Sequence, residues 1–469
     1  MASTTLLPAM LQAVMKGQPK ALADPHYPAW HLAPVTGLLN DPNGFIQFAG
    51  RYHLFYQWNA LGCQHLHKCW AHWSSADLVH WQHEPIALMP DEEYDRNGCY
   101  SGSAIDNNGV LTLCYTGNVK FDDGSRTAWQ CLAVQNSDGG FDKLGPAIPL
   151  PHGYTGHVRD PKVWRHDGQW YMVLGAQDLQ LQGKVLLLRS ENLWNWQNLG
   201  EIAGSDLNGL GDAGYMWECP DMFTLGDRTF LICCPQGVAR EEKRYLNTYP
   251  SAYLSGTLDY ASAQYQHGEF TELDAGFEFY APQTTLADDG RRLLVGWMGV
   301  PDGEEMLQPT VANGWIHQMT CLRELTEHNG KLYQQPVAEL QALRGEEQRY
   351  RGTAEAMPAL EAEQLELVLE SEGGLTLNFA DTLILEWRGD ELRLARRSLQ
   401  TGEWLYRYWR GSAQKLQILC DRSSVEIFIN EGEGVMSSRY FPTHPAQLTL
   451  RGGAEVQAHY WSLRSCMVE

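Results

Sequence analysis

The sequence lacks the features of a membrane or secreted protein. No run of apolar residues approaches the ~18 that a membrane-spanning helix needs. The opening segment, MASTTLLPAMLQAVMKGQPK, has no positively charged stretch followed by an apolar one, so we expect no secretory signal peptide. It predicts instead a short amphipathic helix that ends near Gly17, within an N-terminal helical extension of residues 1–25.

Positive charge is scarce as well. The chain has 35 Lys and Arg against 57 Asp and Glu, which gives a formal net charge of −22. Such a chain repels nucleic acid and anionic membrane surfaces, so we expect neither as a partner. Solubility is the simplest role for this charge.

The cysteines do not form a disulfide framework. There are 11 of them, an odd number without regular spacing, and Cys233 and Cys234 are adjacent. In a chain of 469 residues this pattern indicates free thiols in a reducing compartment. Together with the missing signal peptide and membrane span, it predicts a soluble, cytoplasmic protein.

Short apolar and aromatic runs, broken by Gly, Asn and Asp, fill the chain from about residue 40 to 330. Clear examples are residues 44–50, 52–58, 110–115 and 170–174. Few stretches show a 3.6-residue period, so these runs predict strands of an all-β region. The 17 Trp and 21 Tyr suit strands and also suit stacking on sugar rings.

A weak internal repeat narrows the fold. The segment SADLVHW at 75–81 matches SENLWNW at 190–196 in spacing, and NSDGGF at 136–141 resembles a degenerate copy. A recurring strand-and-turn unit predicts a β-propeller. A coincidental Ser-x-Asx-Leu turn is the alternative.

The pattern changes after residue 335. Pro336 begins a stretch in which Leu340 and Leu343 share one face, which predicts a helix from 337 to about 348 inside a linker of residues 336–352. Alternating strands such as 365–369 and 424–430 then predict a β-sandwich over residues 353–469, which could pack against a second subunit in a homodimer. Residues 26–335 form the predicted propeller.

Three acidic motifs are candidates for chemistry. NDPNG at 40–44 is either a tight loop in which Asp41 caps backbone amides or a carboxylate at a strand mouth beside aromatic walls. RDP at 159–161 is either an exposed ion pair before a rigid turn or a second site carboxylate. In WECPD at 217–221, apolar surroundings and the neighbouring Asp221 would raise the pKa of Glu218, as a general acid requires, unless the motif is a solvated strand-end turn.

The three motifs together, in this order, resemble the signature blocks of glycoside hydrolase family 32, which includes the invertases and bacterial sucrose-6-phosphate hydrolases. FYQ at 55–57, YSGS at 100–103, YAPQ at 280–283, GWM at 296–298 and DRSSVEIF at 421–428 match further family blocks. The resemblance extends from about residue 26 to the end. It implies a five-bladed β-propeller with a funnel-shaped pocket, followed by a β-sandwich.

The resemblance also implies a retaining β-fructofuranosidase that hydrolyses sucrose, or sucrose 6-phosphate, without a metal or cofactor. Asp41 would be the nucleophile, Glu218 the acid/base and Asp160 the stabiliser of the transition state. Retention places the two reacting carboxyl groups about 5–5.5 Å apart. The expected substrate-binding residues are Asn40, Gln57, Lys68, Tyr100, Ser101, Arg159, Tyr280 and Trp297.

Two departures from the family concern the leaving-group side. Leu38 and His65 stand where many members have Trp, and Lys68 lies near enough to supply a contact instead. Lys68 and Arg96 are also the candidates for binding a phosphate group. The alternation of Cys63, His65, His67 and Cys69 suits zinc, but the ends of such a strand would be ~20 Å apart, so we do not expect a metal.

Three other functions remain open from the sequence. A fructosyltransferase would use the same carboxylates and pass the fructosyl group to a sugar. A non-enzymatic sugar-binding module would not need both a nucleophile and an acid. An arabinan-cleaving propeller enzyme shares the three-carboxylate plan, although the Glu-Cys-Pro-Asp block at 218–221 favours fructosides.

Overall fold

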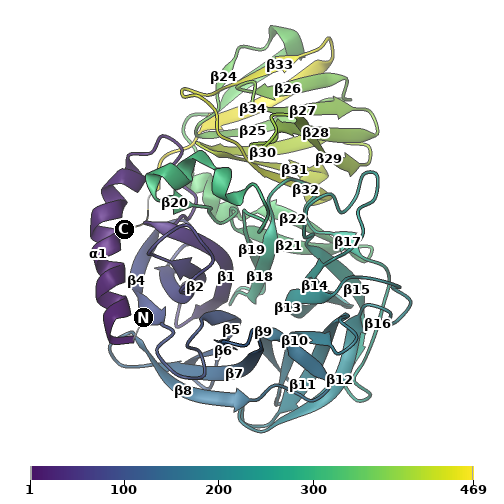
Figure 1. Ribbon diagram of the computed structural model, residues 1–469. Coiled ribbons are helices and arrows are strands. Elements are labelled where there is room, and N and C mark those ends of the chain that lie inside the picture. The colour runs from purple at the N-terminus through teal and green to yellow at the C-terminus, as the bar shows by residue number, and fades with distance from the viewer. Residues whose placement is uncertain (1–2, 467, 469) are drawn as a thin grey trace.

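The computed structural model describes residues 3–466 and residue 468. It contains five sheets arranged in a ring, followed by two larger sheets that pack face to face (Figure 1). The chain is therefore a five-bladed β-propeller followed by a β-sandwich, as predicted. In the part of the chain that the structure describes, no helix combines the length and apolarity needed to cross a membrane.

Each blade is an antiparallel sheet built mainly from consecutive strands. The strands are β1 (Gly37–Phe48), β2 (Arg51–Asn59), β3 (Cys69–Ser75) and β4 (Trp81–Leu88) in blade 1; β5 (Cys99–Asp106), β6 (Leu111–Lys120), β7 (Arg126–Gln135) and β8 (Phe141–Ile148) in blade 2; β9 (Tyr154–His166), β10 (Gln169–Asp178), β11 (Gly183–Ser190) and β12 (Trp196–Gly204) in blade 3; β13 (Met216–Leu225), β14 (Arg228–Gln236), β15 (Ala252–Asp259), β16 (Gln264–His267) and β17 (Thr271–Glu272) in blade 4; and β18 (Tyr280–Leu286), β19 (Arg292–Trp297), β21 (Arg323–His328) and β22 (Lys331–Pro336) in blade 5.

The ring is closed by a strand from the far end of the propeller. β20 (Trp315–Ile316) pairs in parallel with the start of β1, so that Gly37 lies opposite Trp315. The 3-10 helices η1 (Glu305–Leu307) and η2 (Pro309–Asn313) precede it. Blade 1 thus contains segments that are 278 positions apart in the sequence, the separation of Gly37 and Trp315.

The internal repeat is a real structural unit. Its two clear copies connect the third and fourth strands of blades 1 and 3. In both copies a Ser hydroxyl accepts the backbone N–H of the Leu, and the Trp indole donates to the carbonyl of that Leu. The Leu has positive φ in both, 66° at Leu78 and 69° at Leu193. The degenerate copy at 136–141 connects the same two strands of blade 2.

The N-terminal helix is longer than predicted. α1 runs over Ser3–Leu22 and continues past Gly17, where we expected it to end. Its last turn is fastened to the propeller, since Ala21 is fully buried and the Lys20 ammonium donates to the Ala312 carbonyl at 2.6 Å. Tertiary contact therefore outweighs the ~1 kcal/mol that a glycine costs a helix.

The predicted linker helix is shorter than expected. Only the 3-10 helix η3 (Ala338–Leu343) forms, and Gln348 already begins strand β23. Arg344 ends the helix because its backbone is extended and forms a bridge with Leu463, while its guanidinium pairs with Glu366. These partners come from the C-terminal part of the chain, so no local pattern predicts them.

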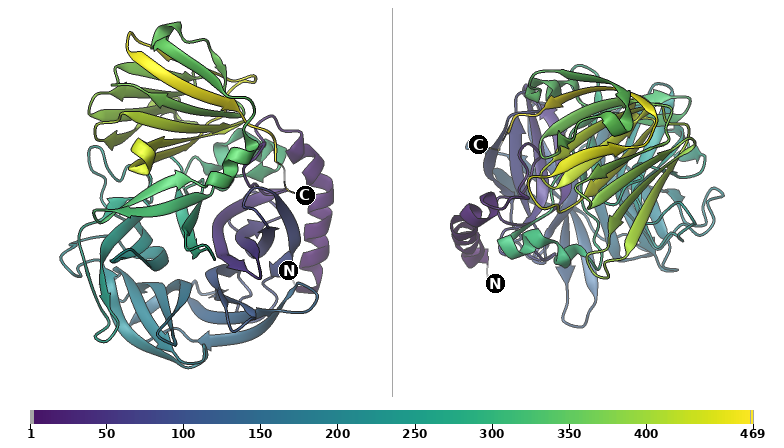
Figure 2. Two further views of the ribbon diagram at one scale, coloured as in Figure 1. Left: turned by 180° about the vertical axis from the view of Figure 1, so that it is seen from behind. Right: turned by 90° about the horizontal axis from the view of Figure 1, so that it is seen from above.

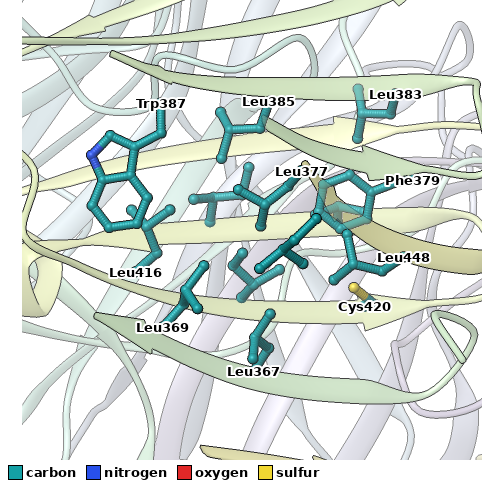
Figure 3. Close-up of a cluster of buried hydrophobic side chains, with 14 of the residues drawn as sticks. Leu367, Leu369, Leu377, Phe379, Leu383, Leu385, Trp387, Leu416, Cys420 and Leu448 are labelled. Carbon is teal, nitrogen blue, oxygen red and sulfur yellow. The ribbon is translucent and has the colours of Figure 1, made fainter. Parts of the chain in front are cut away.

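The sandwich has two six-stranded sheets (Figure 2). One contains β23 (Gln348–Thr353), β34 (Glu455–Ser462), β25 (Leu365–Glu370), β30 (Lys415–Asp421), β31 (Ser424–Ile429) and β32 (Gly434–Arg439); the other contains β24 (Leu360–Glu361), β33 (Gln447–Arg451), β26 (Leu375–Phe379), β27 (Leu383–Arg388), β28 (Glu391–Arg397) and β29 (Trp404–Arg410). The short 3-10 helices η4 (Ala354–Ala356) and η5 (Asn430–Gly432) connect strands. Leucines such as Leu367, Leu377 and Leu385 fill the space between the sheets (Figure 3), each contributing about 1.5–3 kcal/mol by burial.

Buried charges join the sandwich to the propeller. His31, just before blade 1, contacts Asp421 through Nδ1 at 2.8 Å and Glu426 through Nε2 at 2.7 Å. Arg323 of β21 donates to Glu426 at 2.8 Å and lies 3.3 Å from Asp274. Asp421 and Glu426 belong to the DRSSVEIF motif, so that motif builds this contact rather than the pocket.

Candidate active site

A cavity of about 340 Å³ lies at the centre of the propeller. The innermost strands of the blades, β1, β5, β9, β13 and β18, carry half of its lining. All 11 site residues predicted from the sequence line it: Asn40, Asp41, Gln57, Lys68, Tyr100, Ser101, Arg159, Asp160, Glu218, Tyr280 and Trp297. His65, Arg126, Gln236, Tyr249 and Pro301 complete the lining.

Asp41 is held on β1 by its own motif. The pairing of β1 with β2 is interrupted on both sides of Pro42 and Asn43, which turns the Asp41 side chain into the cavity. Asn43 fixes this bend by donating to the Asp41 carbonyl at 2.8 Å and accepting from Gly102 at 3.1 Å. The carboxylate then accepts hydrogen bonds from Ser101 at 2.6 Å and from the Asn40 amide at 3.1 Å.

Asp160 and Cys219 lie in strained backbone conformations. Their φ angles are 69° and 50°, which non-glycine residues adopt rarely and at a cost of about 1–3 kcal/mol. The strain is offset by contacts, since Asp160 Oδ2 accepts the Cys219 N–H at 2.9 Å and the Asp160 N–H donates to Thr116 at 3.0 Å. Strain of this kind, at Asp160 in the cavity and at Cys219 next to it, is typical of a functional site.

The Cys219 thiol connects two of the carboxylates. Its Sγ lies 3.5 Å from Asp41 Oδ2 and 3.6 Å from Asp160 Oδ2. Burial raises the pKa of Cys219 well above its usual value, and the charge of Asp160 adds to the rise, so the sulfur keeps its proton. The thiol therefore donates between Asp41 and Asp160, a role that we did not predict.

Glu218 is surrounded by hydrogen-bond donors. Arg159 donates to Oε1 from Nε at 3.0 Å and from Nη2 at 2.7 Å. Oε2 accepts from the Tyr280 hydroxyl at 2.6 Å and the Gln236 amide at 2.9 Å. Glu218 is thus oriented by three side chains from three different strands.

The charges of the three carboxylates are strongly coupled. Burial raises the pKa of Asp41, and the charge of Glu218 adds to the rise. Burial likewise raises the pKa of Asp160 to about 7, although the positive charge of Arg159 opposes it. For Glu218, burial raises the pKa, but the charge and hydrogen bonds of Arg159 and the hydrogen bond of Tyr280 outweigh it, and the net direction is downward.

The predicted rise in the pKa of Glu218 is therefore wrong for this structure. Asp221, which we expected to affect Glu218, is instead bound by the Thr284 N–H at 2.7 Å and lies 3.3 Å from Lys162. The dominant neighbour of Glu218 is Arg159, whose cationic charge favours the ionised carboxylate.

One of the two departures from the family, His65, belongs to a second polar chain, whereas Leu38 is buried among apolar residues. Lys68 is buried, its ammonium donates to Asn40 Oδ1, and it lies 2.9 Å from His65 Nδ1. His65 Nε2 in turn lies 2.8 Å from Glu305, which also contacts His317 at 2.7 Å. Burial lowers the pKa of Lys68 to about 7, against the raising effect of Asp41 and Glu305.

The alternating residues Cys63, His65, His67 and Cys69 are not grouped as a metal site in the described structure. In the described residues, no group of three or more His, Cys, Asp or Glu is placed to hold a metal ion. The Cys69 thiol donates to the His67 carbonyl at 3.4 Å, while His65 belongs to the Lys68 chain. Arg96 is exposed and paired with Glu93 at 3.3 Å.

A five-bladed propeller whose central cavity holds three carboxylates, two of them within reach of one thiol, is the framework of a glycoside hydrolase. The model of the N-terminal domain of glycosyl hydrolases family 32 matches residues 31–336, and that of the family's C-terminal domain matches residues 390–462. The chain belongs to glycosyl hydrolase family 32, as the motifs predict.

Relatives of known name resemble the chain over nearly all of its length. A sucrose-6-phosphate hydrolase of Salmonella typhimurium is 68% identical over 99% of both chains, and one of Bacillus subtilis is 45% identical over 96% of this chain and 97% of its own. Among solved structures, a sucrose-6-phosphate hydrolase of Lactobacillus gasseri has a TM-score of 0.91 at 32% identity, covering 97% of each chain. A β-fructofuranosidase of Bombyx mori, solved as a mutant with sucrose, has a TM-score of 0.88 at 31% identity over 99% of each chain.

Two of the residues that sequence reasoning missed, Gln236 and Arg126, carry no motif. Gln236 ends β14 and reaches Glu218 only because β13 and β14 pair. Arg126 begins β7 and reaches the cavity from blade 2. Cys219 lies inside the predicted ECPD block, so its position was visible although its role between two carboxylates was not.

Proposed function

We propose that this chain is a retaining β-fructofuranosidase that hydrolyses sucrose or sucrose 6-phosphate. The observation that carries the proposal is that Asp41, Asp160 and Glu218, which are far apart in the sequence, line one cavity. The names of the relatives in Salmonella, Bacillus and Bombyx agree with this substrate class. We further propose that no metal or cofactor takes part, because each step can be assigned to a side chain.

In the proposed first step, ionised Asp41 attacks C2 of the fructosyl unit while Glu218 gives its proton to the glycosidic oxygen. The C2–O bond to the leaving glucose or glucose 6-phosphate breaks, and a fructosyl ester of Asp41 forms. In the second step, Glu218 takes a proton from water, whose oxygen attacks C2 and frees Asp41. Two displacements at C2 retain the configuration.

Asp160 has a separate proposed role. Its carboxylate would accept hydrogen bonds from two hydroxyl groups of the furanose ring, and such charge-assisted bonds are about twice as strong as neutral ones. If they tighten as positive charge develops on the ring, they stabilise the transition state more than the bound substrate. The strained backbone of Asp160 and its bond to Cys219 keep the carboxylate in place for this task.

The proton needed by Glu218 is proposed to come from within the carboxylate cluster. With the pKa of Asp160 near 7 and that of Glu218 lowered, the cluster binds a proton at Asp160 around neutral pH. Sugar hydroxyls that donate to Asp160 favour its ionised form and so lower its pKa. We infer that substrate binding thereby transfers the preferred protonation site toward Glu218, where the proton is used.

The test is to incubate the purified protein with sucrose and follow the first-formed fructose by NMR. Release of the β anomer of fructofuranose before mutarotation supports the proposal. Abundant fructan with little free fructose would favour the fructosyltransferase. Sugar binding without any turnover would favour a non-enzymatic module, and cleavage of arabinan in place of sucrose would favour the arabinan-cleaving enzyme.

Asp41→Asn separates turnover from binding. The substitution removes the nucleophile but keeps nearly the same shape, so we expect sucrose to bind and turnover to be lost. Asp106→Asn, at the exposed end of β5, is the matched control and should retain activity. Full activity of Asp41→Asn would refute the assignment.

We also propose that the chain divides into residues 1–25, 26–335, 336–352 and 353–469, with the first sandwich strand, β23, beginning inside the third segment. The protein is cytoplasmic, in keeping with its free thiols such as Cys233 and Cys234. A homodimer would form through the β-sandwich, and its mass in solution tests this directly.

A further inference from the structure

Positive charge gathers on one side of the cavity in an otherwise acidic protein. Arg126 of β7 lines the cavity, and the charges of Arg159, Tyr100 and Glu218 act on it. His157 lies beside it on β9. Burial lowers the pKa of His157, and the charges of Arg159, Arg126 and Lys120 lower it further, to about 4. Two cationic side chains, Arg126 and Arg159, and one neutral histidine thus lie near Glu218.

Arg126 is held in this position by glycine. A Cβ atom added to Gly156 would overlap the Cγ atom and the carbonyl oxygen of Arg126, so the side chain passes directly over β9 at a point where only glycine fits. Its Nη2 donates to Asn118 at 2.6 Å, whereas its Nε is buried and has no hydrogen-bond partner. Among the described residues no carboxylate pairs with this guanidinium, and the only other side chain that interacts with it by a hydrogen bond is Tyr100.

The cavity's other cations are already used by the protein. Arg159 is bound to Glu218 by two hydrogen bonds, and the Lys68 ammonium is taken by Asn40 and His65. Arg96, which the sequence suggested as a phosphate ligand, packs against Phe121 and pairs with Glu93 outside the cavity lining. Arg126 is left as the cavity arginine that an anion can bind.

His157 does not itself line the cavity, but it contacts Arg159, which does, and offers a second donor there. Arg159 Nη1 lies 2.9 Å from His157 Nδ1, and because a guanidinium can only donate, Nδ1 accepts and the ring proton is on Nε2. The neutral imidazole can therefore donate from Nε2 even at neutral pH. Two acidic residues, Asp122 and Asp123, lie on the β6–β7 hairpin that carries Arg126. Both are exposed, and Ser125 donates hydrogen bonds to Asp123.

Arg126 also lies on the side where the leaving group must depart. Glu218 protonates the glycosidic oxygen in the proposed mechanism, so the fructosyl unit lies toward Asp41 and the leaving sugar lies beyond Glu218. Arg126 and His157 both interact electrostatically with Glu218. This interaction places them on the Glu218 side of the cavity, where the proposed mechanism puts the leaving sugar.

We propose that Arg126, assisted by His157, binds a phosphate group on the leaving sugar and so selects sucrose 6-phosphate over sucrose. The inference rests on the β-fructofuranosidase function proposed above. A guanidinium binds phosphate oxygens through paired N–H donors and keeps its charge at any relevant pH. Burial lowers the pKa of Arg126, and repulsion from Arg159 lowers it further. A dianionic phosphate between the two side chains would relieve this repulsion.

The test compares kcat/KM for sucrose 6-phosphate and for sucrose in three proteins: the wild type, Arg126→Gln and Arg96→Gln. The wild type should prefer the phosphorylated sugar, and Arg126→Gln should reduce this preference about tenfold or more, because a charge-assisted contact is lost. Arg96→Gln is the matched control, an arginine near the same hairpin, and should leave both constants unchanged. Inhibition by glucose 6-phosphate gives a second readout, which should weaken in Arg126→Gln and recover in part in Arg126→Lys.

Each contrary outcome has a distinct meaning. An equal fall of both constants in Arg126→Gln, or an unchanged preference, would overturn the phosphate site. A wild type that hydrolyses sucrose without preferring its phosphate would overturn the phosphate site and leave the proposed function standing. A wild type that hydrolyses neither sugar would overturn the proposed function itself.

Discussion

Arg159 donates two hydrogen bonds to the same oxygen of Glu218, from Nε at 3.0 Å and from Nη2 at 2.7 Å. The two residues are 59 positions apart and come from the inner strands of neighbouring blades. Burial raises the pKa of Glu218, and this contact is the largest of the interactions that together outweigh burial and lower that pKa. It links the RDP and WECPD motifs into one electrostatic unit.

Replacing Arg159 should therefore change the pH dependence of the reaction. Removal of the cation in Arg159→Gln raises the pKa of Glu218, so the high-pH limb of kcat/KM for sucrose, where the acid loses its proton, should move to higher pH. The maximum rate should fall as well, because Glu218 loses its orientation. The measurement is the pH dependence of kcat/KM from pH 4 to 9, and the apparent pKa values it yields belong to the coupled cluster as a whole. Arg96→Gln should leave the limb in place, and an unmoved limb in Arg159→Gln would refute the role given to this contact.

Cys219 offers a second test of the carboxylate cluster. Cys219→Ala removes the donor between Asp41 and Asp160, so both carboxylates lose stabilisation of their ionised forms and kcat should fall, by about tenfold for a lost contact of ~1.4 kcal/mol. Cys219→Ser keeps a donor and should retain more activity at every pH. The buried Cys114, which lies in blade 2, supplies the control Cys114→Ala. Equal activities of the Ala and Ser variants at position 219 would show that the thiol only fills space.

The buried His31 should make the stability of the fold depend on pH. Burial lowers its pKa, but hydrogen bonds and charges from Asp421 and Glu426 outweigh this and raise it from 6.5 to about 8. Since the folded pKa is the higher one, the stabilisation is complete below about pH 6.5 and is lost as the pH rises through about 8. A difference of this size corresponds to about 2 kcal/mol at most.

Urea unfolding of the wild type and of His31→Gln at pH 6 and pH 8.5 measures this effect. The wild type should lose stability between the two values, and the variant should lose less. The partner Glu426 affects stability in acid instead. Burial raises its pKa, but His31 and Arg323 outweigh this and lower the folded pKa to about 2, so its stabilisation is lost as the pH falls toward that value. Identical losses in both proteins between pH 6 and 8.5 would exclude His31 as the source.

The residues proposed from the sequence line one cavity because the motifs that carry them encode local geometry. The residues of NDPNG bend β1 and orient Asp41, and the repeat around Leu78 and Leu193 forms the same turn in two blades. What the sequence could not predict depends on contacts between blades. The lowered pKa of Glu218 comes from Arg159 in the next blade, and the position of Arg126 depends on Gly156 in another strand.

The predicted ends of two helices were wrong for the same reason. α1 continues beyond Gly17 because Lys20 and Ala21 are held by the propeller, and the linker helix stops at Arg344 because Leu463 and Glu366 bind it there. Local propensity is a weak determinant when tertiary contacts compete with it.

The central claim is that Asp41 forms a covalent bond to the fructosyl unit. A β-fructofuranosyl fluoride needs no acid to depart, so the variant Glu218→Gln should accept the fructosyl group yet fail to activate water for its release. Mass spectrometry of this variant after brief reaction and acid quenching should find one fructosyl group on the peptide that contains Asp41, and none in the double variant that also carries Asp41→Asn. Turnover of the fluoride without any labelled protein, and with inversion at C2, would contradict the account.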